Sequence, residues 1–233
     1  MNPRQESVLK AIVENYIKTA EPVGSKFLAE RCGFSVSPAT LRNDMVVLDQ
    51  EGFIRAPHTS AGRVPTEKGY EFYLASIRNM RRASSKQQFS DAITEARTQE
   101  GAVKQVAKKL VDLSGEMALV AFDPNWSYYT GISNLFAKPD FARLGLTQEL
   151  SEMMDRFDEV VNSLYEHLPE APQVMIGGEN PFGRRMSSIM VKYALPDDTS
   201  VLIGLVGPIR MDYKKNISLL EEAVESLSEI IYE

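Results

Sequence analysis

The chain has 233 residues, of which 43% are hydrophobic and 25% are charged, a mixture that is typical of globular proteins. This composition excludes a collagen-like, a broadly disordered and a disulfide-rich protein. The single cysteine, Cys32, cannot form an internal disulfide, the first residues do not resemble a signal peptide, and no apolar run is long enough to span a bilayer. We therefore expect a cytoplasmic protein that does not enter a membrane.

The net charge of −6 is unevenly distributed along the chain. Residues 1–86 carry a net charge of +4, whereas residues 87–233 carry −10. A basic segment joined to an acidic one predicts that only the first part of the chain meets a polyanion such as nucleic acid. The alternative is that an excess this small arose by chance.

Three helices are expected at the start of the chain. Apolar residues at three- and four-residue spacing predict a helix over residues 3–20. A second helix is expected over residues 25–31, with Ser25 as its N-cap. The pair Ser37-Pro38 places a capping residue before a proline, which predicts that a third helix begins there and runs to Glu51.

The pattern then changes from helical to extended. Phe53-Ile54-Arg55 predicts a short strand, the turn-rich residues 57–62 follow, and Arg63-Val64 can return as a second strand. Thr66 can cap a fourth helix. This order of elements is typical of a winged helix-turn-helix, so we expect residues 1–82 to form a DNA-binding domain of that kind.

The remainder of the chain predicts a mixed helix and sheet domain. Residues 83–115 are expected to be a linker followed by a long helix over 91–113. Residues 116–233 combine strands with segregated helices, which is typical of an α+β domain. The expected strands cover 117–122, 173–176, 187–193 and 200–206, and the expected helices cover 147–168 and 216–232.

Candidate catalytic residues are scarce. The chain has two histidines, His58 and His167, and one cysteine, too few to supply a Cys/His metal site. The sequence contains neither a phosphate-binding loop nor a nucleophile-elbow motif, and its paired carboxylates fall on helix faces that solvent would cover. We therefore expect no catalytic residue, no metal, no cofactor and no enzyme activity.

The third helix carries the stronger functional signal. Leu41, Met45 and Leu48 form its apolar stripe, so small and polar residues occupy its outer face and its start. Such a helix start can enter a DNA major groove, where Arg42 suits guanine edges and Asn43 suits adenine edges. The alternative is an ordinary amphipathic helix with a good cap.

The hairpin strengthens this interpretation. Residues 53–86 contain seven basic and two acidic side chains, and the turn is small and rich in hydrogen-bond donors. Such a turn can lie along a phosphate backbone or in a minor groove, although a merely polar turn is the alternative. The predicted DNA-contacting residues are Ser25, Lys26, Ser37, Pro38, Thr40, Arg42, Asn43, His58, Thr59, Ser60, Gly62 and Arg63.

Several motifs resemble the HrcA family of heat-inducible transcription repressors. They are EPVGS, ATLRN and PHTSAGRVPT near the start, YYTGISNLFAKPDF in the middle, and IGGENPF and GLVGPIRMDY toward the end. The resemblance implies a dimeric repressor of chaperone genes that binds an inverted-repeat DNA operator. It also implies a winged helix-turn-helix, then a GAF-like domain that carries an inserted dimerisation domain, and the chaperonin GroEL as a partner that keeps the repressor active.

The sequence departs from the family between Phe122 and Trp126. Family members continue there with further GAF-like strands and the inserted domain, whereas this chain has a short turn. We therefore expect a reduced GAF-like domain, with a homodimer interface on the 91–113 helix or on the C-terminal domain. A second hypothesis is that the C-terminal domain senses a small molecule or a protein, through an apolar pocket near Trp126 and Tyr129, and regulates another operon.

Overall fold

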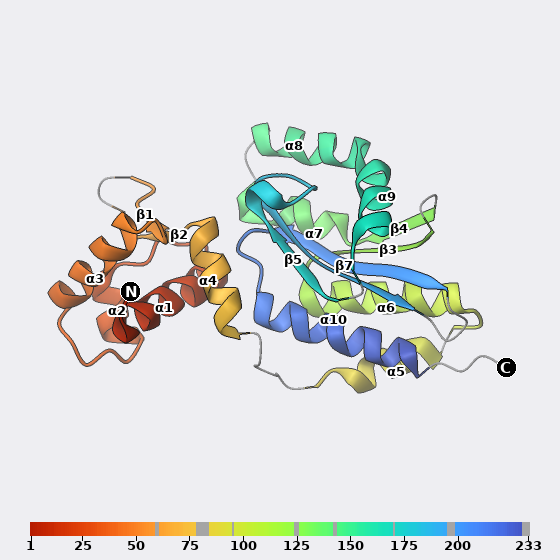
Figure 1. Ribbon diagram of the computed structural model, residues 1–233, viewed down its shortest axis with the longest axis horizontal. Coiled ribbons are helices and arrows are strands. Elements are labelled where there is room, and N and C mark those ends of the chain that lie inside the picture. The colour runs from red at the N-terminus through yellow and green to blue at the C-terminus, as the bar shows by residue number, and fades with distance from the viewer. Residues whose placement is uncertain are drawn as a thin grey trace. The chain divides into compact units, whose positions relative to one another are not determined.

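In a computed structural model the chain divides into two units, one of residues 1–80 and one of residues 81–233 (Figure 1). The first unit consists of helices and a small hairpin, and the second combines helices with a sheet. The structure describes residues 1–58, 61–77, 84–94, 96–123, 126–141, 144–169, 171–194 and 199–229.

The first unit contains the predicted helices and both predicted strands. Asn2 begins α1 through a capping box with Gln5, in which each side chain bonds the other's backbone N–H. Ser25 is the first residue of α2, not its predicted N-cap, and Gly24 occupies the cap position. The elements are α1 (Pro3–Thr19), α2 (Ser25–Arg31), α3 (Pro38–Gln50), β1 (Ile54–Arg55), β2 (Val64–Pro65) and α4 (Glu67–Ile77).

The apolar faces that residue spacing predicted for α1 and α3 are both buried in the core of the first unit. Val8, Leu9 and Ile12 of α1 are fully buried, as are Leu41 and Leu48 of α3. Each such side chain contributes roughly 1.5–3 kcal/mol on burial, so these two stripes account for much of the unit's stability.

The predicted single helix over 91–113 is wrong, because two helices occupy this region. These are α5 (Lys86–Thr94) and α6 (Gln99–Ser114), so a helix begins where a linker was expected. Thr98 starts α6 as an N-cap, since its hydroxyl accepts a hydrogen bond from the Gly101 N–H at 3.1 Å. Apolar periodicity continues across the break, so it could not reveal the second start.

The second unit is built on an antiparallel sheet of five strands in the order β4-β3-β7-β6-β5. Four of these strands were predicted, and the edge strand β4 was missed because it has neither regular apolar alternation nor a buried face. Asp123 pairs with Trp126, so β3 and β4 are neighbours at the site of the expected departure from the family. The strands are β3 (Met117–Asp123), β4 (Trp126–Thr130), β5 (Gln173–Ile176), β6 (Met186–Ala194) and β7 (Ser200–Pro208).

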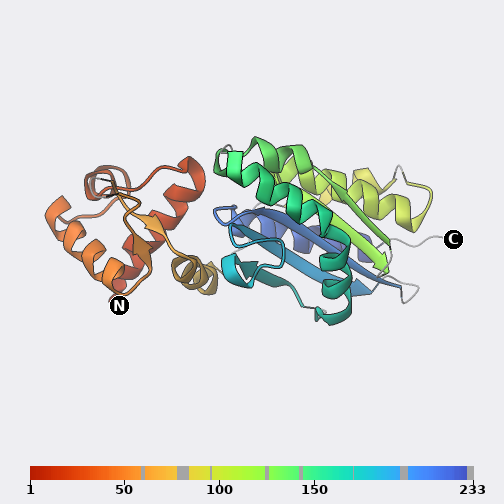
Figure 2. The same ribbon diagram turned by 90° about the horizontal axis from the view of Figure 1, so that it is seen from above.

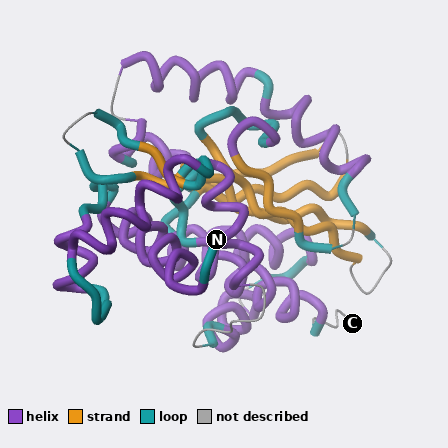
Figure 3. The backbone as a smooth tube through the Cα atoms, turned by 60° about the vertical axis from the view of Figure 1, so that its left-hand side comes forward, coloured by secondary structure: helices purple, strands orange, loops and turns teal. Residues whose placement is uncertain are grey.

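Helices cover both faces of this sheet (Figure 3). One face packs on α6 and α10 (Tyr213–Ser228), with α5 beside them. On the other face, apolar residues of the sheet meet α7 (Ile132–Ala137), α8 (Leu144–Asp155) and α9 (Phe157–His167) in one core. Seen from above, α8 and α9 lie over the strands (Figure 2).

The predicted helix over 147–168 is also two helices. The chain leaves helical geometry at Arg156, with φ −104° and ψ 7°, and α9 begins at Phe157. Leu150 and Met153 of α8 and Phe157 of α9 all belong to the same core. Within the described residues, no helix is both long and apolar enough to cross a bilayer.

Candidate nucleic-acid interface

Helix α3 presents the residues that the sequence assigned to its outer face. Ser37 caps the helix, accepting a hydrogen bond from the Thr40 N–H at 3.2 Å, and Pro38 follows as the first helical residue. Arg42 and Asn43 are exposed, whereas the Leu41, Met45 and Leu48 stripe is buried. The start and the outer face of α3 are therefore exposed to solvent.

The two carboxylates of α3 are both held by arginines from other elements. Asp44 has only 5% of its side chain exposed and takes a two-point contact from Arg4 of α1, with Nε–Oδ2 at 2.7 Å and Nη2–Oδ1 at 3.2 Å. The hydrogen bond and the charge of Asp44 raise the pKa of Arg4. Asp49 pairs with Arg63, Nε to Oδ2 at 2.7 Å.

These pairings decide the charge that α3 shows to solvent. Each aspartate would repel a phosphate, and each is compensated by an arginine beside it. Within the described residues, Arg42 makes no ion pair, so its guanidinium stays available to an external acceptor. The Arg4–Asp44 contact also joins α3 to α1.

The hairpin is fastened to the loop before α2. Arg63 and Val23 exchange backbone hydrogen bonds of 2.9 and 2.8 Å. A Cβ at Gly62 would lie 2.6 Å from backbone atoms of Val23, so this close approach requires glycine. Gly62 and Arg63 therefore have structural roles beside the predicted DNA contact, and the side chain of Arg63 is already engaged by Asp49.

The remaining predicted residues differ in accessibility. His58 is exposed at the start of the turn, whereas Thr59 and Ser60 lie outside the described residues. Lys26 has 82% of its side chain exposed, at 3.9 Å from Glu30. Ser25 is only 7% exposed, because it faces the interior at the start of α2, and its side chain is not part of this surface.

Sequence reasoning missed Arg4 and Asp49, which take part in the two ion pairs of α3. No local signal could have found them, because their partners lie on other elements. Arg4 and Asp44 are 40 residues apart, and Asp49 pairs with Arg63 of the hairpin. The Arg4–Asp44 pairing becomes visible only when α1 and α3 pack together. In the described part of the chain, no group of three or more His, Cys, Asp or Glu side chains is placed to hold a metal ion.

The HrcA protein C-terminal domain family matches residues 73–217, more than half of the chain. The chain belongs to the HrcA family. This match lies largely in the second unit, so the family assignment does not rest on the motifs near α3 alone.

Named relatives of the HrcA family cover about half of this chain. A "Heat-inducible transcription repressor HrcA" of Synechococcus elongatus is 44% identical over 126 residues, 52% of this chain and 36% of the relative. The protein of the same name from Cutibacterium acnes is 41% identical over 124 residues, 52% of this chain and 37% of the relative. The chain thus spans about a third of the length of the curated relatives it matches.

One solved structure shares the fold over nearly the whole chain. A crystal structure of a hypothetical protein at 2.2 Å resolution superposes with a TM-score of 0.78 and covers 98% of both chains at 21% sequence identity. At this identity the likeness concerns the fold alone.

Proposed function

We propose that this HrcA-family chain is a DNA-binding transcriptional repressor of heat-shock genes. Residues 1–82 serve as a winged helix-turn-helix, with α3 as the recognition helix and the β1–β2 hairpin as the wing. The observation that carries the proposal is the outer face of α3, where Arg42 and Asn43 are exposed while both helix carboxylates are compensated by arginines.

The contacts follow from the chemistry of these side chains. Arg42 donates to guanine edges and Asn43 pairs with adenine edges in the major groove. Ser37, Thr40 and Lys26 contact phosphates and set the register without reading sequence. Small residues at the helix start, Pro38 among them, let the backbone approach the groove closely. The wing, with His58, lies along the neighbouring backbone.

An inverted-repeat operator favours a protein dimer with two-fold symmetry, because two equivalent half-sites meet two equivalent recognition helices. We therefore include a homodimer in the proposal, with its interface on the second unit, a reduced GAF-like domain. The chaperonin GroEL is the proposed partner that maintains the active repressor. Light scattering of the purified chain tests the dimer, and co-sedimentation with the chaperonin tests the partner.

Fluorescence anisotropy at one fixed salt concentration tests the proposed function. The full chain is titrated into a labelled inverted-repeat operator of the family and into a scrambled duplex of equal length. We expect a marked preference for the operator and a log–log salt slope of about −0.9 for each phosphate neutralised. Equal binding to both duplexes would contradict a sequence-specific repressor.

The variant Arg42→Ala separates base reading from general attraction. We expect the operator complex to weaken by about 1–3 kcal/mol, while binding to the scrambled duplex changes little. Arg97→Ala removes an equal charge from an exposed position before α6 and is the matched control. If Arg42→Ala weakens both duplexes equally, Arg42 contacts phosphate and α3 does not read the sequence through it.

A further inference from the structure

Val46 is an exposed apolar residue on the outer face of α3. It is 42% exposed, more than any other large hydrophobic residue in the described part of the chain. Met45 before it is buried in the core of the first unit, whereas Val46 is not part of that core. Valine is also a poorer helix former than alanine, because its β-branched side chain is restricted in a helix. Neither core packing nor helix formation therefore accounts for a valine at this position.

The position of Val46 on the helix places it beside the two candidate base-reading residues. It follows Arg42 by four residues and Asn43 by three, and these spacings bring side chains to one face of a helix. All three residues are exposed, as is Ala39 one turn before Asn43. The outer face of α3 thus presents two hydrogen-bonding side chains followed by an apolar one.

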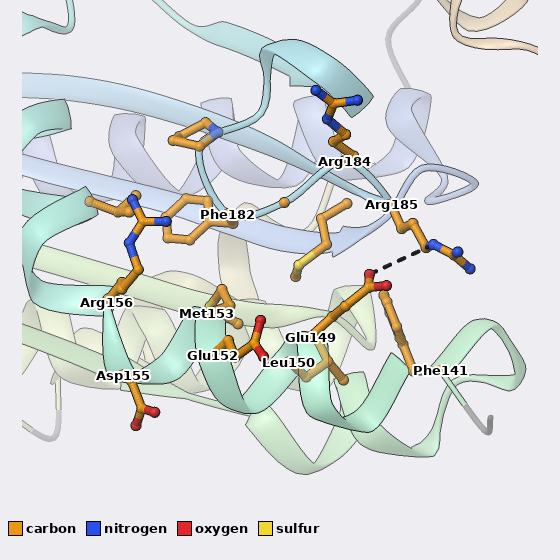
Figure 4. Close-up of a pocket in the computed structure, with 14 residues that line it drawn as sticks. Phe141, Glu149, Leu150, Glu152, Met153, Asp155, Arg156, Phe182, Arg184 and Arg185 are labelled. Atoms are coloured by element: carbon orange, nitrogen blue, oxygen red, sulfur yellow. Dashed lines mark ion pairs between the residues drawn. The ribbon is translucent and has the colours of Figure 1, made fainter. Parts of the chain in front are cut away.

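The apolar side chains around the hollow of the second unit differ from Val46, because they are buried. This hollow has a volume of about 720 Å³ and lies between α8, the start of α9 and the loop that joins β5 to β6 (Figure 4). Met153 and Phe182 line it, but they are only 7% and 3% exposed and belong to the core. Glu149 and Arg185 also line it, and they pair with each other at 3.7 Å. Val46, in contrast, is accessible to an external partner.

The hollow is also not the pocket expected near Trp126 and Tyr129, because neither residue lines it. Those two rings pack edge-on against Phe122 and Phe157, each pair at 4.9 Å between centroids. The aromatic side chains of β4 are thus engaged by neighbours within the second unit.

A thymine methyl group is the external partner that fits Val46. The isopropyl group of valine neither donates nor accepts a hydrogen bond. In the major groove every base presents hydrogen-bonding atoms, but thymine also presents its C5-methyl group, which is apolar. Valine on that methyl group removes apolar surface from water, whereas valine against a guanine or adenine edge would leave polar atoms without partners. The side chain therefore favours one base and penalises the others.

We propose that Val46 reads a thymine in each operator half-site by packing against its C5-methyl group. An α-helix rises about 1.5 Å per residue, so Val46 lies about 6 Å beyond Arg42 along the helix axis. Base pairs stack about 3.4 Å apart, which places this thymine one or two base pairs from the base that Arg42 reads. The inference rests on the proposed function, since it requires α3 to enter the major groove.

Operator duplexes that contain deoxyuridine in place of thymidine test the proposal, because deoxyuridine lacks only the C5-methyl group. Fluorescence anisotropy compares the full wild-type chain with Val46→Ala, on the thymidine operator and on duplexes that are substituted at one position in each half-site. At one such position, loss of the methyl group should weaken wild-type binding by about fourfold per half-site and leave Val46→Ala unaffected. Equal losses in both proteins at every position would overturn the proposal.

Two controls separate this contact from effects on the fold. Val47→Ala changes the next residue of α3, which is half-buried, and should keep the wild-type dependence on the methyl group. Val46→Ala should leave the urea midpoint of unfolding unchanged or raise it, because alanine favours the helix. A marked fall in that midpoint would overturn the proposal, since Val46 would then be a packing residue.

The failure of this inference and the failure of the proposed function have different signatures. A preference for the operator over the scrambled duplex, without coupling between Val46 and any thymine methyl group, would overturn this inference alone. Equal binding of the thymidine operator and the scrambled duplex would overturn the proposed function and this inference with it.

Discussion

The two units of this chain use charged side chains in opposite ways. In the first unit, arginines compensate Asp44 and Asp49 at the edge of α3, which leaves an exposed face with Arg42 available. In the second unit, Glu116 is enclosed between the end of α6 and β3, with only 4% of its side chain exposed. An arginine thus compensates each aspartate of α3 beside an exposed helix face, whereas Glu116 is enclosed beside a lysine.

The enclosed carboxylate has named neighbours. Lys138 Nζ lies 2.9 Å from Glu116 Oε1, and the charges of Arg210 and Asp140 also act on it. Burial raises the pKa of Glu116 to about 7, and the attraction of Lys138 and Arg210 offsets only part of this rise. Burial likewise raises the pKa of Tyr213, and the negative charge of Glu116 adds to that shift.

The largest loss of stability is expected from Gly69→Ala in α4 of the first unit. A Cβ at this position would lie 2.2 Å from the carbonyl oxygen of Phe53, and a backbone atom cannot move aside as a flexible side chain can. We expect a loss of about 3 kcal/mol in the free energy of unfolding, although alanine favours a helix by roughly 1 kcal/mol over glycine.

Urea denaturation followed by two signals measures this loss. Circular dichroism reports both units, whereas the fluorescence of Trp126, the one tryptophan of the chain, reports the second unit. Gly69→Ala should shift the first unit's transition and leave the fluorescence transition in place. Glu71→Ala, on the exposed side of the same helix, is the control and should change stability by less than about 0.5 kcal/mol. An unchanged transition of the first unit in Gly69→Ala would contradict the close approach of α4 to the carbonyl of Phe53.

The next largest effect is a dependence of the second unit's stability on pH. Because the pKa of Glu116 is raised on folding, the folded state holds this proton more tightly than the unfolded state. The resulting stabilisation is complete below pH 4.5 and is lost as the pH rises through about 7. We expect the second unit to be less stable at about pH 8 than at about pH 5, by on the order of 2–3 kcal/mol.

Trp126 fluorescence in urea at both pH values measures this difference. Glu116→Gln carries no titratable group and should remove most of the pH dependence, while its amide can still accept a bond from Lys138. Glu100→Gln, which replaces an exposed carboxylate, should keep the wild-type dependence. A pH dependence in Glu116→Gln equal to that of the wild type would contradict the raised pKa of Glu116.

The smallest effect is expected from Asp49→Asn, and its sign is informative. The substitution removes a negative charge from α3 and releases Arg63 from its ion pair at 2.7 Å. If α3 and the wing meet DNA, operator affinity should increase by about twofold to threefold at low salt, and the gain should fade as salt is added. Anisotropy with Asp112→Asn of α6 as the control measures this, and a loss of affinity would mean that Asp49 serves mainly to hold the wing in place.

Local sequence signals predicted most helices and strands, and they failed where tertiary contacts determine the start or the end of an element. The cap at Ser37 and the stripe of Leu41, Met45 and Leu48 gave α3 correctly, because both act within one helix. Ser25 has the residue type of a cap but lies inside the helix start, because the loop before it pairs with Arg63. The helix break at Arg156 had no local signal, because the apolar spacing of Leu150, Met153 and Phe157 continues across it.

The sequence by itself determined the helices of the first unit, four of the five strands, the exposed polar face of α3 and the family motifs. Periodicity and capping are properties of neighbouring residues, so they can be read without a fold. Only the tertiary structure decided that Arg4 and Arg63 compensate the carboxylates of α3, that Glu116 is enclosed, and that α8 faces the loop before β6 across a hollow. These features join residues that are distant in the chain, and burial and charge act through the distances that folding sets.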